Sequence, residues 1–434
     1  MDWTSRRSTA LHGEVIVPGD KSVSHRAIMF AALADGESRI DGFLEGEDTR
    51  ATAAAFERMG VVIQTPSPSR RVVHGVGLHG LRPADGPLDC GNAGTGMRLL
   101  AGLLAGQAFD SVLVGDESLT RRPMSRVIDP LIAMGAAIQA EQGGRPPLRI
   151  RGGRRLHGIQ CTPPVASAQV KSAILLAGLY AEGTTEVHEV HPTRDYSERM
   201  LAAFGWPIEF EEGWARLQGG HRLRATDVVV PADFSSAAFF LVAASLVPGS
   251  VVCLPAVGLN PRRTGLLDVL RLMGADISEE NRREQGGEVI ADLQVRHAPL
   301  HGIDVPLDRV ADMIDEFPIL FVAAAAARGT TRVRGAAELR VKESDRIALM
   351  ARGLRALGVE VAEHDDGADI SGGNIGGGAI LSGGDHRIAM SFAVAGLVAD
   401  AAVRIGDCAN VATSFPGFIE LANRCGFSLD STTG

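Results

Sequence analysis

The chain has 434 residues, of which 45% are hydrophobic and 22% charged, and it carries a formal net charge of −9. This length exceeds what one hydrophobic core usually serves, so we expect two or three domains in an ordinary soluble globular protein. The acidic balance argues against a general nucleic-acid or acidic-membrane binder. It leaves room for a locally positive site that binds a small anion.

The cysteines fit a reducing compartment, and the apolar segments argue against a membrane span and a signal peptide. The five cysteines form no CxxC pair or metal-ligand spacing; they are Cys90, Cys161, Cys253, Cys408 and Cys425. The longest apolar runs, 237–247 and 318–327, are too short to span a bilayer, and residues 1–7 are not followed by the apolar stretch of a signal peptide. We therefore expect a cytoplasmic protein that binds neither membranes nor nucleic acid.

A pattern in which an apolar residue and a glycine end a helix recurs six times along the chain. Its glycines are spaced by 68 to 84 residues: Gly60, Gly135, Gly205, Gly274, Gly358 and Gly426. Alanine-rich helical stretches end at a second series, with Asp400 in the sixth place: Gly36, Gly106, Gly183, Gly249 and Gly329. Glycine after a helix is the usual left-handed cap, and the β-branched residues that follow indicate strands. We therefore expect six units of roughly strand, helix, strand, helix, strand.

Each alanine-rich helix is preceded by polar residues that fit an N-cap, and most of these segments add a cation. The segments are 18–26, 91–98, 167–171, 233–236, 315–318 and 385–387. A helix N-terminus presents unpaired N–H groups and partial positive charge, so it binds phosphate or carboxylate readily. If the units are arranged pseudo-symmetrically, these ends converge on one anion-binding cleft. The alternative is that the caps are only caps.

The six units divide into three and three, with the main boundary near Pro231. An N-terminal strand is expected over 14–17 and joins the second half of the chain. We predict one domain over 19–231 and a second that combines 1–18 with 232–434. The two adjacent linkers form a hinge of the kind that closes domains over a substrate.

Lysine stands at only three positions, Lys21, Lys171 and Lys342, so 40 of the 43 cationic side chains are arginine. A position that keeps lysine under such a bias is a candidate for a role that needs the compact ammonium. For Lys171 an exposed helix position is an equally good interpretation. Lys342 lies in the charged stretch 338–346, just before a helix expected over 347–357. An exposed, salt-bridged helix start is the alternative for this stretch.

Four segments, in this order, resemble the 5-enolpyruvylshikimate 3-phosphate synthase family of enolpyruvyl transferases. They are PGDKSVSHR at 18–26, GNAGTGMR at 91–98, RVKESDR at 340–346 and DHR at 385–387. The resemblance runs over nearly the whole chain. It implies an α/β (α+β) fold of two pseudo-symmetric domains, each built from three βαβαββ repeats as an inside-out α/β barrel, joined by a two-stranded hinge.

The resemblance also implies a reaction. The enolpyruvyl group of phosphoenolpyruvate is transferred to the 5-hydroxyl of shikimate 3-phosphate through a tetrahedral addition intermediate, and phosphate is released. This step belongs to the shikimate pathway to chorismate and the aromatic amino acids. No metal or organic cofactor is implied, the expected partners are the two small-molecule substrates, and we expect a monomer.

Both substrates are anions, so the site requires cations and helix N-termini. By the resemblance, the residues that bind phosphoenolpyruvate are Lys21, Gly94, Arg122, Gln169, Arg346 and Arg387. Those that bind shikimate 3-phosphate are Lys21, Ser22, Arg26, Ser167, Ala168, Gln169, Arg194, Asp315 and Lys342. Arg194 is a candidate extra clamp on the phosphate, because arginine suits bidentate contact.

Addition needs a base for the 5-hydroxyl and an acid for the methylene carbon. By the resemblance, Asp315 is the base, Glu343 exchanges protons with the methylene, and Lys21 belongs with them as a catalytic residue. Taken alone, Asp315 would be interpreted as a helix cap and Glu343 as a surface acid.

The chain departs from the family pattern at three places: Thr413 stands where many members have a lysine nearby, Glu338 where many have asparagine, and Ala168 where a second serine is common. These differences bear on affinity and detailed contacts. Gly94 implies inhibition by glyphosate, which a Gly94→Ala change should weaken.

Two other functions remain open. The related transferase that acts on UDP-N-acetylglucosamine usually carries a cysteine in the loop that corresponds to 116–123, and this chain has none there. A non-catalytic anion-binding scaffold would need the helix ends but would gain nothing from Asp315 and Glu343. The lack of a Gly-Lys-Ser/Thr ending in 91–98 argues against a nucleotide-binding P-loop.

Overall fold

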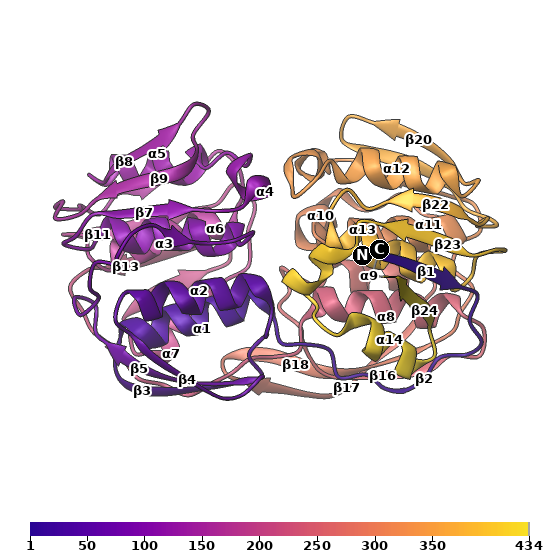
Figure 1. Cartoon of the computed structure of the whole chain (residues 1–434), viewed down its shortest axis with the longest axis horizontal. Helices are drawn as coiled ribbons and strands as arrows, with labels where there is room; N and C mark the ends of the chain where they lie inside the picture. The colour runs from indigo at the N-terminus through magenta and orange to yellow at the C-terminus, as the bar shows by residue number, and fades with distance from the viewer. Residues whose placement is uncertain (433–434) are drawn as a thin grey trace. The chain divides into compact units, whose positions relative to one another are not determined.

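The computed structural model describes residues 1–432, a mixed α/β chain that separates into two compact units. Unit 1 contains Met1–Pro18, Pro231–Glu284 and the chain from Val289 on. Unit 2 contains Gly19–Val230 and Gln285–Glu288. Figure 1 traces the chain and labels its elements.

Unit 2 holds three sheets in which the first two strands are parallel and the next pairs are antiparallel. The first is β14 (Leu223–Arg224), β3 (Ala34–Asp41), β5 (Arg70–Val76) and β4 (Val62–Ser67), with β15 (Val228–Val229) also on β3. The second is β6 (Leu88–Asp89), β7 (Ser111–Val114), β9 (Arg145–Arg151) and β8 (Ala137–Glu141). The third is β10 (Gln160–Cys161), β11 (Thr184–His188), β13 (Trp214–Gln218) and β12 (Ile208–Glu211).

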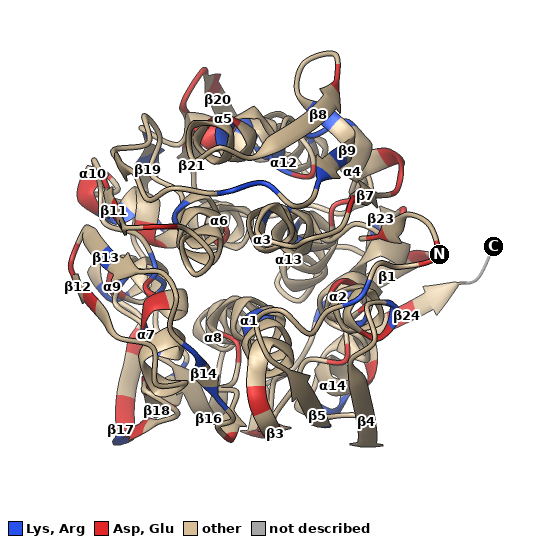
Figure 2. Ribbon diagram, turned by 90° about the vertical axis from the view of Figure 1, so that its left-hand side faces the viewer, with Lys and Arg blue, Asp and Glu red and all other residues tan. Residues whose placement is uncertain are grey.

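Three helices of unit 2 are buried almost all round: α1 (Lys21–Leu33), α3 (Gly94–Ala105) and α6 (Ala168–Gly178). Their ribbons are largely uncharged in Figure 2, while acidic and basic residues mark the strands and loops around them. Small residues allow close packing: a Cβ at Gly102 of α3 would lie 2.1 Å from the Ala173 carbonyl oxygen of α6. The outer helices are α2 (Glu47–Arg58), α4 (Glu117–Thr120), α5 (Ser125–Ala133) and α7 (Tyr196–Ala203).

Unit 1 also holds three sheets. The first is β2 (His12–Glu14), β16 (Val251–Gly258), β18 (Glu288–Arg296) and β17 (Asp276–Gln285). The second is β19 (Thr330–Val333), β21 (Gly367–Ser371) and β20 (Glu360–His364). The third is β22 (Gly378–Leu381), β23 (Val403–Gly406), β1 (Asp2–Arg6) and β24 (Ser428–Thr432). Because β1 pairs antiparallel with both β23 and β24, the first residues of the chain belong to this unit.

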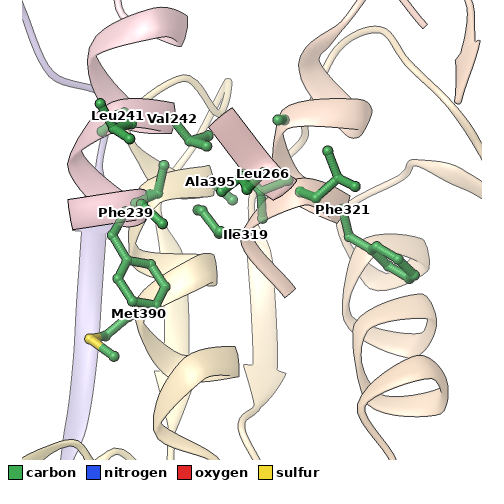
Figure 3. Packing of buried hydrophobic residues seen from close by; sticks show 14 of the residues in the cluster. Phe239, Leu241, Val242, Leu266, Ile319, Phe321, Met390 and Ala395 are labelled. Carbon is green, nitrogen blue, oxygen red and sulfur yellow. The ribbon is translucent and has the colours of Figure 1, made fainter. Parts of the chain in front are cut away.

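The core of unit 1 is formed by α8 (Phe234–Leu246), α11 (Phe317–Ala326) and α13 (His386–Gly396), which are apolar on nearly every face. Figure 3 shows Phe239 of α8, Ile319 of α11 and Ala395 of α13 in this core. The remaining helices are α9 (Gly265–Leu272), α10 (Leu307–Val310), α12 (Arg346–Ala356) and α14 (Phe418–Cys425), with 3₁₀ turns η1 (Ala311–Met313), η2 (Ala337–Val341) and η3 (Ala409–Thr413).

The periodic glycines behave as predicted in one series and only partly in the other. All six glycines of the first series have positive φ, from 78° at Gly205 to 113° at Gly426, a conformation that glycine adopts without steric cost. In the second series the prediction of a left-handed cap is wrong at Gly106, because its φ is −90°. The expected strand over 14–17 is also displaced: β2 ends at Glu14, although the Val15 amide still donates to the Cys253 carbonyl at 2.8 Å. Within residues 1–432, no helix combines the length and apolarity needed to cross a membrane.

Candidate active site

The candidate residues of unit 2 gather at the entrances of its buried helices. Asp20 caps α1, where its side chain accepts from the Val23 amide at 2.8 Å. Lys21 follows, and its Nζ lies 3.0 Å from Asp48 Oδ2. The side chain of Lys21 is 21% exposed. The next turn brings the Ser22 carbonyl to the Arg26 guanidinium. The ammonium of Lys21 is therefore fixed by a carboxylate and still reaches solvent.

Arg26 is buried and tied to two other helices. Its Nε donates to Ser197 Oγ at 2.7 Å, and its Nη2 donates to Ser172 Oγ at 2.8 Å. Burial, and after it the positive charge of Arg194, lowers the pKa of Arg26 to about 10. The effect of Arg194 on the pKa of Arg26 indicates that the two cations belong to one positive region. The structure thus gives Arg26 a role in joining α1, α6 and α7 beside its expected role in binding.

The entrances of α3 and α6 are linked by Gln169. Its side-chain oxygen accepts from Arg98 Nη1 at 2.6 Å, and its side-chain nitrogen donates to Thr95 Oγ1 at 2.8 Å. Ser167 is the N-cap of α6, and its hydroxyl accepts from the Val170 amide at 3.5 Å. Ala168, between them, is buried and offers no polar side-chain atom.

Gly94 lies against two guanidinium groups. A Cβ at this position would lie 3.0 Å from Arg122 Nη1 and 3.3 Å from Arg98 Nη1. Arg122 Nη2 donates to Asn92 Oδ1 at 2.6 Å and to Ser118 Oγ at 3.1 Å. The missing side chain of Gly94 therefore keeps the space in front of both cations open.

Lys171 is only 3% exposed, so the alternative of an exposed helix position is wrong. Its Nζ lies 2.7 Å from Glu189 Oε2 and 2.7 Å from Glu198 Oε1. It also donates to the Thr193 carbonyl, at 3.4 Å, one residue before Arg194. These partners are 18 or more residues away along the chain, so no spacing in the sequence announced them.

The charged stretch of unit 1 surrounds Arg346, the first residue of α12, which is 1% exposed. Its Nε donates to Asp385 Oδ2 at 2.8 Å, its Nη2 donates to Glu343 Oε2 at 2.6 Å, and its Nη1 lies 3.6 Å from Asp315 Oδ1. Burial alone would lower the pKa of Arg346, but these carboxylates raise it overall. Conversely, burial would raise the pKa of Asp385, but Arg346 and His386 lower it overall. The interpretation of 338–346 as an exposed helix start is wrong.

Asp315 lies between several cations. Lys342 Nζ is 3.8 Å from Asp315 Oδ1 and 3.0 Å from Glu338 Oε1. Arg387 Nη1 donates to the Asp315 backbone carbonyl at 3.1 Å. Asp315 is not the cap of α11, because that helix begins at Phe317 with Glu316 as its N-cap and without a side-chain cap bond. The alternative of a purely capping aspartate is therefore wrong.

The sequence reasoning missed two buried residues behind Asp315. Arg263 Nη1 lies 2.9 Å from Glu316 Oε1 and 3.4 Å from Asp315 Oδ2. Glu316, 1% exposed, also accepts a hydrogen bond from Ser235 and lies 3.5 Å from Arg387 Nη1. Glu316 could have been found because it directly follows Asp315 in the sequence. Arg263 lies 52 residues from Asp315, so no local pattern pointed to it.

The expected helix caps are present at four of the six entrances. Asp20, Ser167, Asp233 and Asp385 each accept a backbone N–H of the first turn. At α3 and α11 the N-cap residues are Ala93 and Glu316, without a side-chain bond, so the prediction is wrong there. Thr413, where a nearby lysine was noted as missing, donates to the Asn410 carbonyl at 2.7 Å within η3.

In each unit the candidate residues combine ordered cations with the N-termini of buried helices. Comparison with known proteins assigns the family. Residues 5–421 match the family model described as EPSP synthase (3-phosphoshikimate 1-carboxyvinyltransferase). The chain belongs to the EPSP synthase family. Because the match covers nearly the whole chain, the resemblance seen in four short segments is confirmed.

Individual relatives agree with this assignment. The chain is 70% identical to the 3-phosphoshikimate 1-carboxyvinyltransferase of Xanthomonas oryzae pv. oryzae strain PXO99A over 429 residues, which are 99% of this chain and 98% of that protein. It is 68% identical over the same length to that of Xanthomonas campestris pv. campestris strain B100. A solved EPSP synthase from Acinetobacter baumannii has a TM-score of 0.89 at 51% identity and covers 99% of this chain and 100% of that one. The fold is therefore that of the EPSP synthases.

Proposed function

We propose that this member of the EPSP synthase family transfers the enolpyruvyl group of phosphoenolpyruvate to the 5-hydroxyl of shikimate 3-phosphate, with release of phosphate. The observation that carries the proposal is the match of residues 5–421 to the family model. The reaction is a step of the shikimate pathway toward chorismate and the aromatic amino acids.

The residues of unit 2 bind the anions in this proposal. Phosphoenolpyruvate is bound by Lys21, Gly94, Arg122 and Gln169. The largely buried cations Lys21 and Arg122 offset its phosphate and carboxylate charges. The residues that hold shikimate 3-phosphate in this unit are Lys21, Ser22, Arg26, Ser167, Ala168, Gln169 and Arg194. Support comes from the first turns of α1, α3 and α6, whose N–H groups and side chains supply hydrogen bonds to anions.

The residues of unit 1 move protons and complete the binding set. Asp315 accepts the proton of the 5-hydroxyl as the hydroxyl oxygen forms a bond to C2 of phosphoenolpyruvate. Glu343 gives a proton to C3. Glu343 then takes a proton back from C3 as the C2–O bond to phosphate breaks. Arg346 and Arg387 bind phosphoenolpyruvate, and Lys342 binds shikimate 3-phosphate.

The charges around these carboxylates support the roles. Arg346 is within ion-pair distance of both Asp315 and Glu343, so both acids are ordered by one buried cation. A fixed position within reach of the substrate is the first requirement of a general acid or base. Lys21, expected as a third catalytic residue, contributes positive charge from unit 2 to the same reaction.

The finer architecture is part of the proposal. Five of the six sheets begin with a parallel pair and continue with antiparallel strands, and beside β19 two parallel bridges, His301–Arg328 and Asp304–Arg332, take the same place. This recurrence supports three βαβαββ repeats in each of two pseudo-symmetric inside-out barrels, with the chain segments near Pro18 and Pro231 as a two-stranded hinge. We also propose that the protein is a cytoplasmic monomer.

The test is phosphate release from phosphoenolpyruvate by the purified chain, with and without shikimate 3-phosphate. Release that depends strictly on shikimate 3-phosphate supports the proposal. Release that requires UDP-N-acetylglucosamine instead would assign the related transferase. Phosphate release without any acceptor, or none with either, would contradict both.

A further inference from the structure

The cluster around Lys171 is a buried charged group of unit 2 that the proposed reaction does not use. Its three charged side chains, Lys171, Glu189 and Glu198, are each at most 3% exposed. Burying charges costs free energy unless each is paired and hydrogen-bonded, so such a cluster is kept for a structural or functional reason.

The ammonium of Lys171 uses its three N–H donors on three acceptors. Two are the carboxylates of Glu189 and Glu198, each at 2.7 Å, and the third is the Thr193 carbonyl at 3.4 Å. Burial alone would lower the pKa of Lys171, but the two glutamates raise it overall, so the ammonium stays charged. This point-like arrangement suits the compact ammonium and not the planar fork of arginine, in a chain that otherwise uses arginine almost throughout.

These acceptors belong to one segment, the connection from β11 to α7. Glu189 directly follows β11, Thr193 lies within the connection, and Glu198 is in the first turn of α7. Glu189 also accepts hydrogen bonds from the Thr193 amide, at 3.2 Å, and from the Thr193 hydroxyl. Lys171 therefore holds the beginning, the middle and the end of this connection against α6.

The connection carries Arg194, the proposed clamp on the phosphate of shikimate 3-phosphate. Next to Lys171, Ser172 accepts from Arg26 Nη2 at 2.8 Å and from Ser197 Oγ at 2.7 Å. Arg26 and Arg194 interact electrostatically, as the lowered pKa of Arg26 records. Two like charges that interact in this way must be held in place by other contacts. The Lys171 cluster provides them, because Lys171 binds the Thr193 carbonyl next to Arg194 and is itself followed by Ser172, which binds Arg26.

We propose that Lys171 is a positioning residue that holds the 189–195 connection on α6, so that Arg194 is ordered for the phosphate of shikimate 3-phosphate. The inference rests on the proposed function, because it takes shikimate 3-phosphate as the acceptor. Lys171 itself touches no substrate in this account. Its loss leaves Glu189 and Glu198 buried without their cation, and the connection is released.

The experiment compares steady-state kinetics of wild type, Lys171→Met and Arg194→Met. Coupling of this kind changes affinity by about 3- to 30-fold, so we expect the KM for shikimate 3-phosphate to rise by that factor in Lys171→Met. The KM for phosphoenolpyruvate and kcat should change by less than about twofold, which is the usual scatter among independent sites. In the double variant the two effects on KM should be markedly less than additive, because both changes remove the same phosphate contact.

Shikimate without its phosphate provides a readout that a general loss of stability would not give. With shikimate as the acceptor, kcat/KM should be the same in wild type and in Lys171→Met. Leu148→Ala, a cavity in the core of the same unit, is the matched control: it should lower the melting temperature and leave the KM for shikimate 3-phosphate unchanged. Lys171→Arg should not restore the wild-type KM.

Thr193→Val tests the same connection if Lys171→Met does not fold. It removes only the hydroxyl that donates to Glu189, and a smaller rise in the KM for shikimate 3-phosphate is expected. An unchanged KM in folded Lys171→Met, or in Thr193→Val when Lys171→Met is unfolded, overturns the inference. If Arg194→Met itself leaves this KM unchanged, the clamp and the inference both fail while the transferase assignment stands. If wild type does not use shikimate 3-phosphate, the proposed function fails first.

Discussion

The two units hold charge differently at the entrances of their buried helices. In unit 2 the guanidinium groups of Arg26, Arg98 and Arg122 donate to neutral oxygens of serine, glutamine and asparagine side chains. The two lysines at these entrances, Lys21 and Lys171, form ion pairs with carboxylates. In unit 1 the entrances of α11, α12 and α13 interleave cations with carboxylates. The set consists of the cations Arg263, Arg346 and Arg387 and the carboxylates Glu316, Asp315, Glu343 and Asp385.

This difference separates binding from proton transfer. A cation that donates to neutral oxygens keeps its net charge for an incoming anion, because hydrogen bonds to such oxygens order it without neutralising it. A carboxylate held between cations is fixed in place, and its proton affinity is set by its neighbours. In the proposed reaction, unit 2 accordingly supplies most of the anion-binding residues, and unit 1 supplies the acid and the base together with Lys342, Arg346 and Arg387.

The largest contrast is expected in catalysis. Asp315→Asn keeps the shape of the side chain but cannot accept a proton, so kcat should fall by about 10²- to 10⁴-fold. Arg122→Met in unit 2 should act mainly through a higher KM for phosphoenolpyruvate. Steady-state kinetics on both variants would measure this, and a kcat for Asp315→Asn within tenfold of wild type would remove Asp315 from the chemistry.

Stability should follow the same division. Arg346→Met leaves Asp385, Glu343 and Asp315 without their common cation, and breaking a buried pair in this way costs about 3–5 kcal/mol. Urea denaturation at pH 7 should therefore show a large loss for Arg346→Met and a smaller one for Arg122→Met, because Arg122 donates to the neutral side chains of Asn92 and Ser118. Equal losses would show that the buried carboxylates of unit 1 do not depend on Arg346.

Acid should weaken unit 2 at milder pH than unit 1, because His25 is buried in α1. Burial, with Lys21 and Arg26, lowers the pKa of His25 to about 3. Between about pH 6.5 and 3 the unfolded chain binds a proton that the folded chain refuses, so this group's contribution is fully present above about pH 6.5 and falls by up to about 1.4 kcal/mol per pH unit below it.

His25→Gln, which retains a polar partner for Thr52 Oγ1, should flatten this pH dependence between pH 6 and 4.5. The lowered pKa of Asp385 in unit 1 has the same sign of effect but acts at lower pH. Its stabilising contribution is present above the unfolded-state value of about 3.9 and is lost only as the pH falls below it. Parallel urea curves for wild type and His25→Gln at each pH would contradict the assignment to His25.

The smallest expected effect concerns Gly94. The added methyl of Gly94→Ala would lie 3.0 Å from Arg122 Nη1, so the guanidinium must shift by a few tenths of an ångström. We expect the KM for phosphoenolpyruvate to rise by up to about tenfold, equivalent to about 1.4 kcal/mol, and inhibition by glyphosate to weaken more than that. Wild-type activity that is unaffected by millimolar glyphosate would make the prediction wrong.

The sequence predicted what depends on local pattern. The six left-handed glycines, the start of α12 beside Arg346 and the capping roles of Asp20, Ser167 and Asp385 all follow from short-range rules of helix ends and turns. The predictions at Ala93 and Gly106 are wrong, because α3 has no side-chain cap at its first turn and ends at its last turn without a left-handed glycine.

The sequence could not predict which charges meet across the chain. Arg263 reaches Glu316, and Lys171 reaches Glu198, through packing of helices that are far apart in sequence. Composition did give a hint at Lys171, since lysine is rare in this chain, but its buried partners are set by the fold. The residues that support the site were therefore harder to predict than the residues proposed to touch the substrates.

The central claim is that unit 1 exchanges protons with C3 of phosphoenolpyruvate while unit 2 supplies most of the residues that bind the substrate anions. The most direct test is the reaction in D₂O, with deuterium in the methylene group of the product followed by NMR or mass spectrometry. Wild type should incorporate deuterium in the presence of shikimate 3-phosphate, while Glu343→Gln should bind both substrates and incorporate almost none. Incorporation by Glu343→Gln at the wild-type rate would contradict the account.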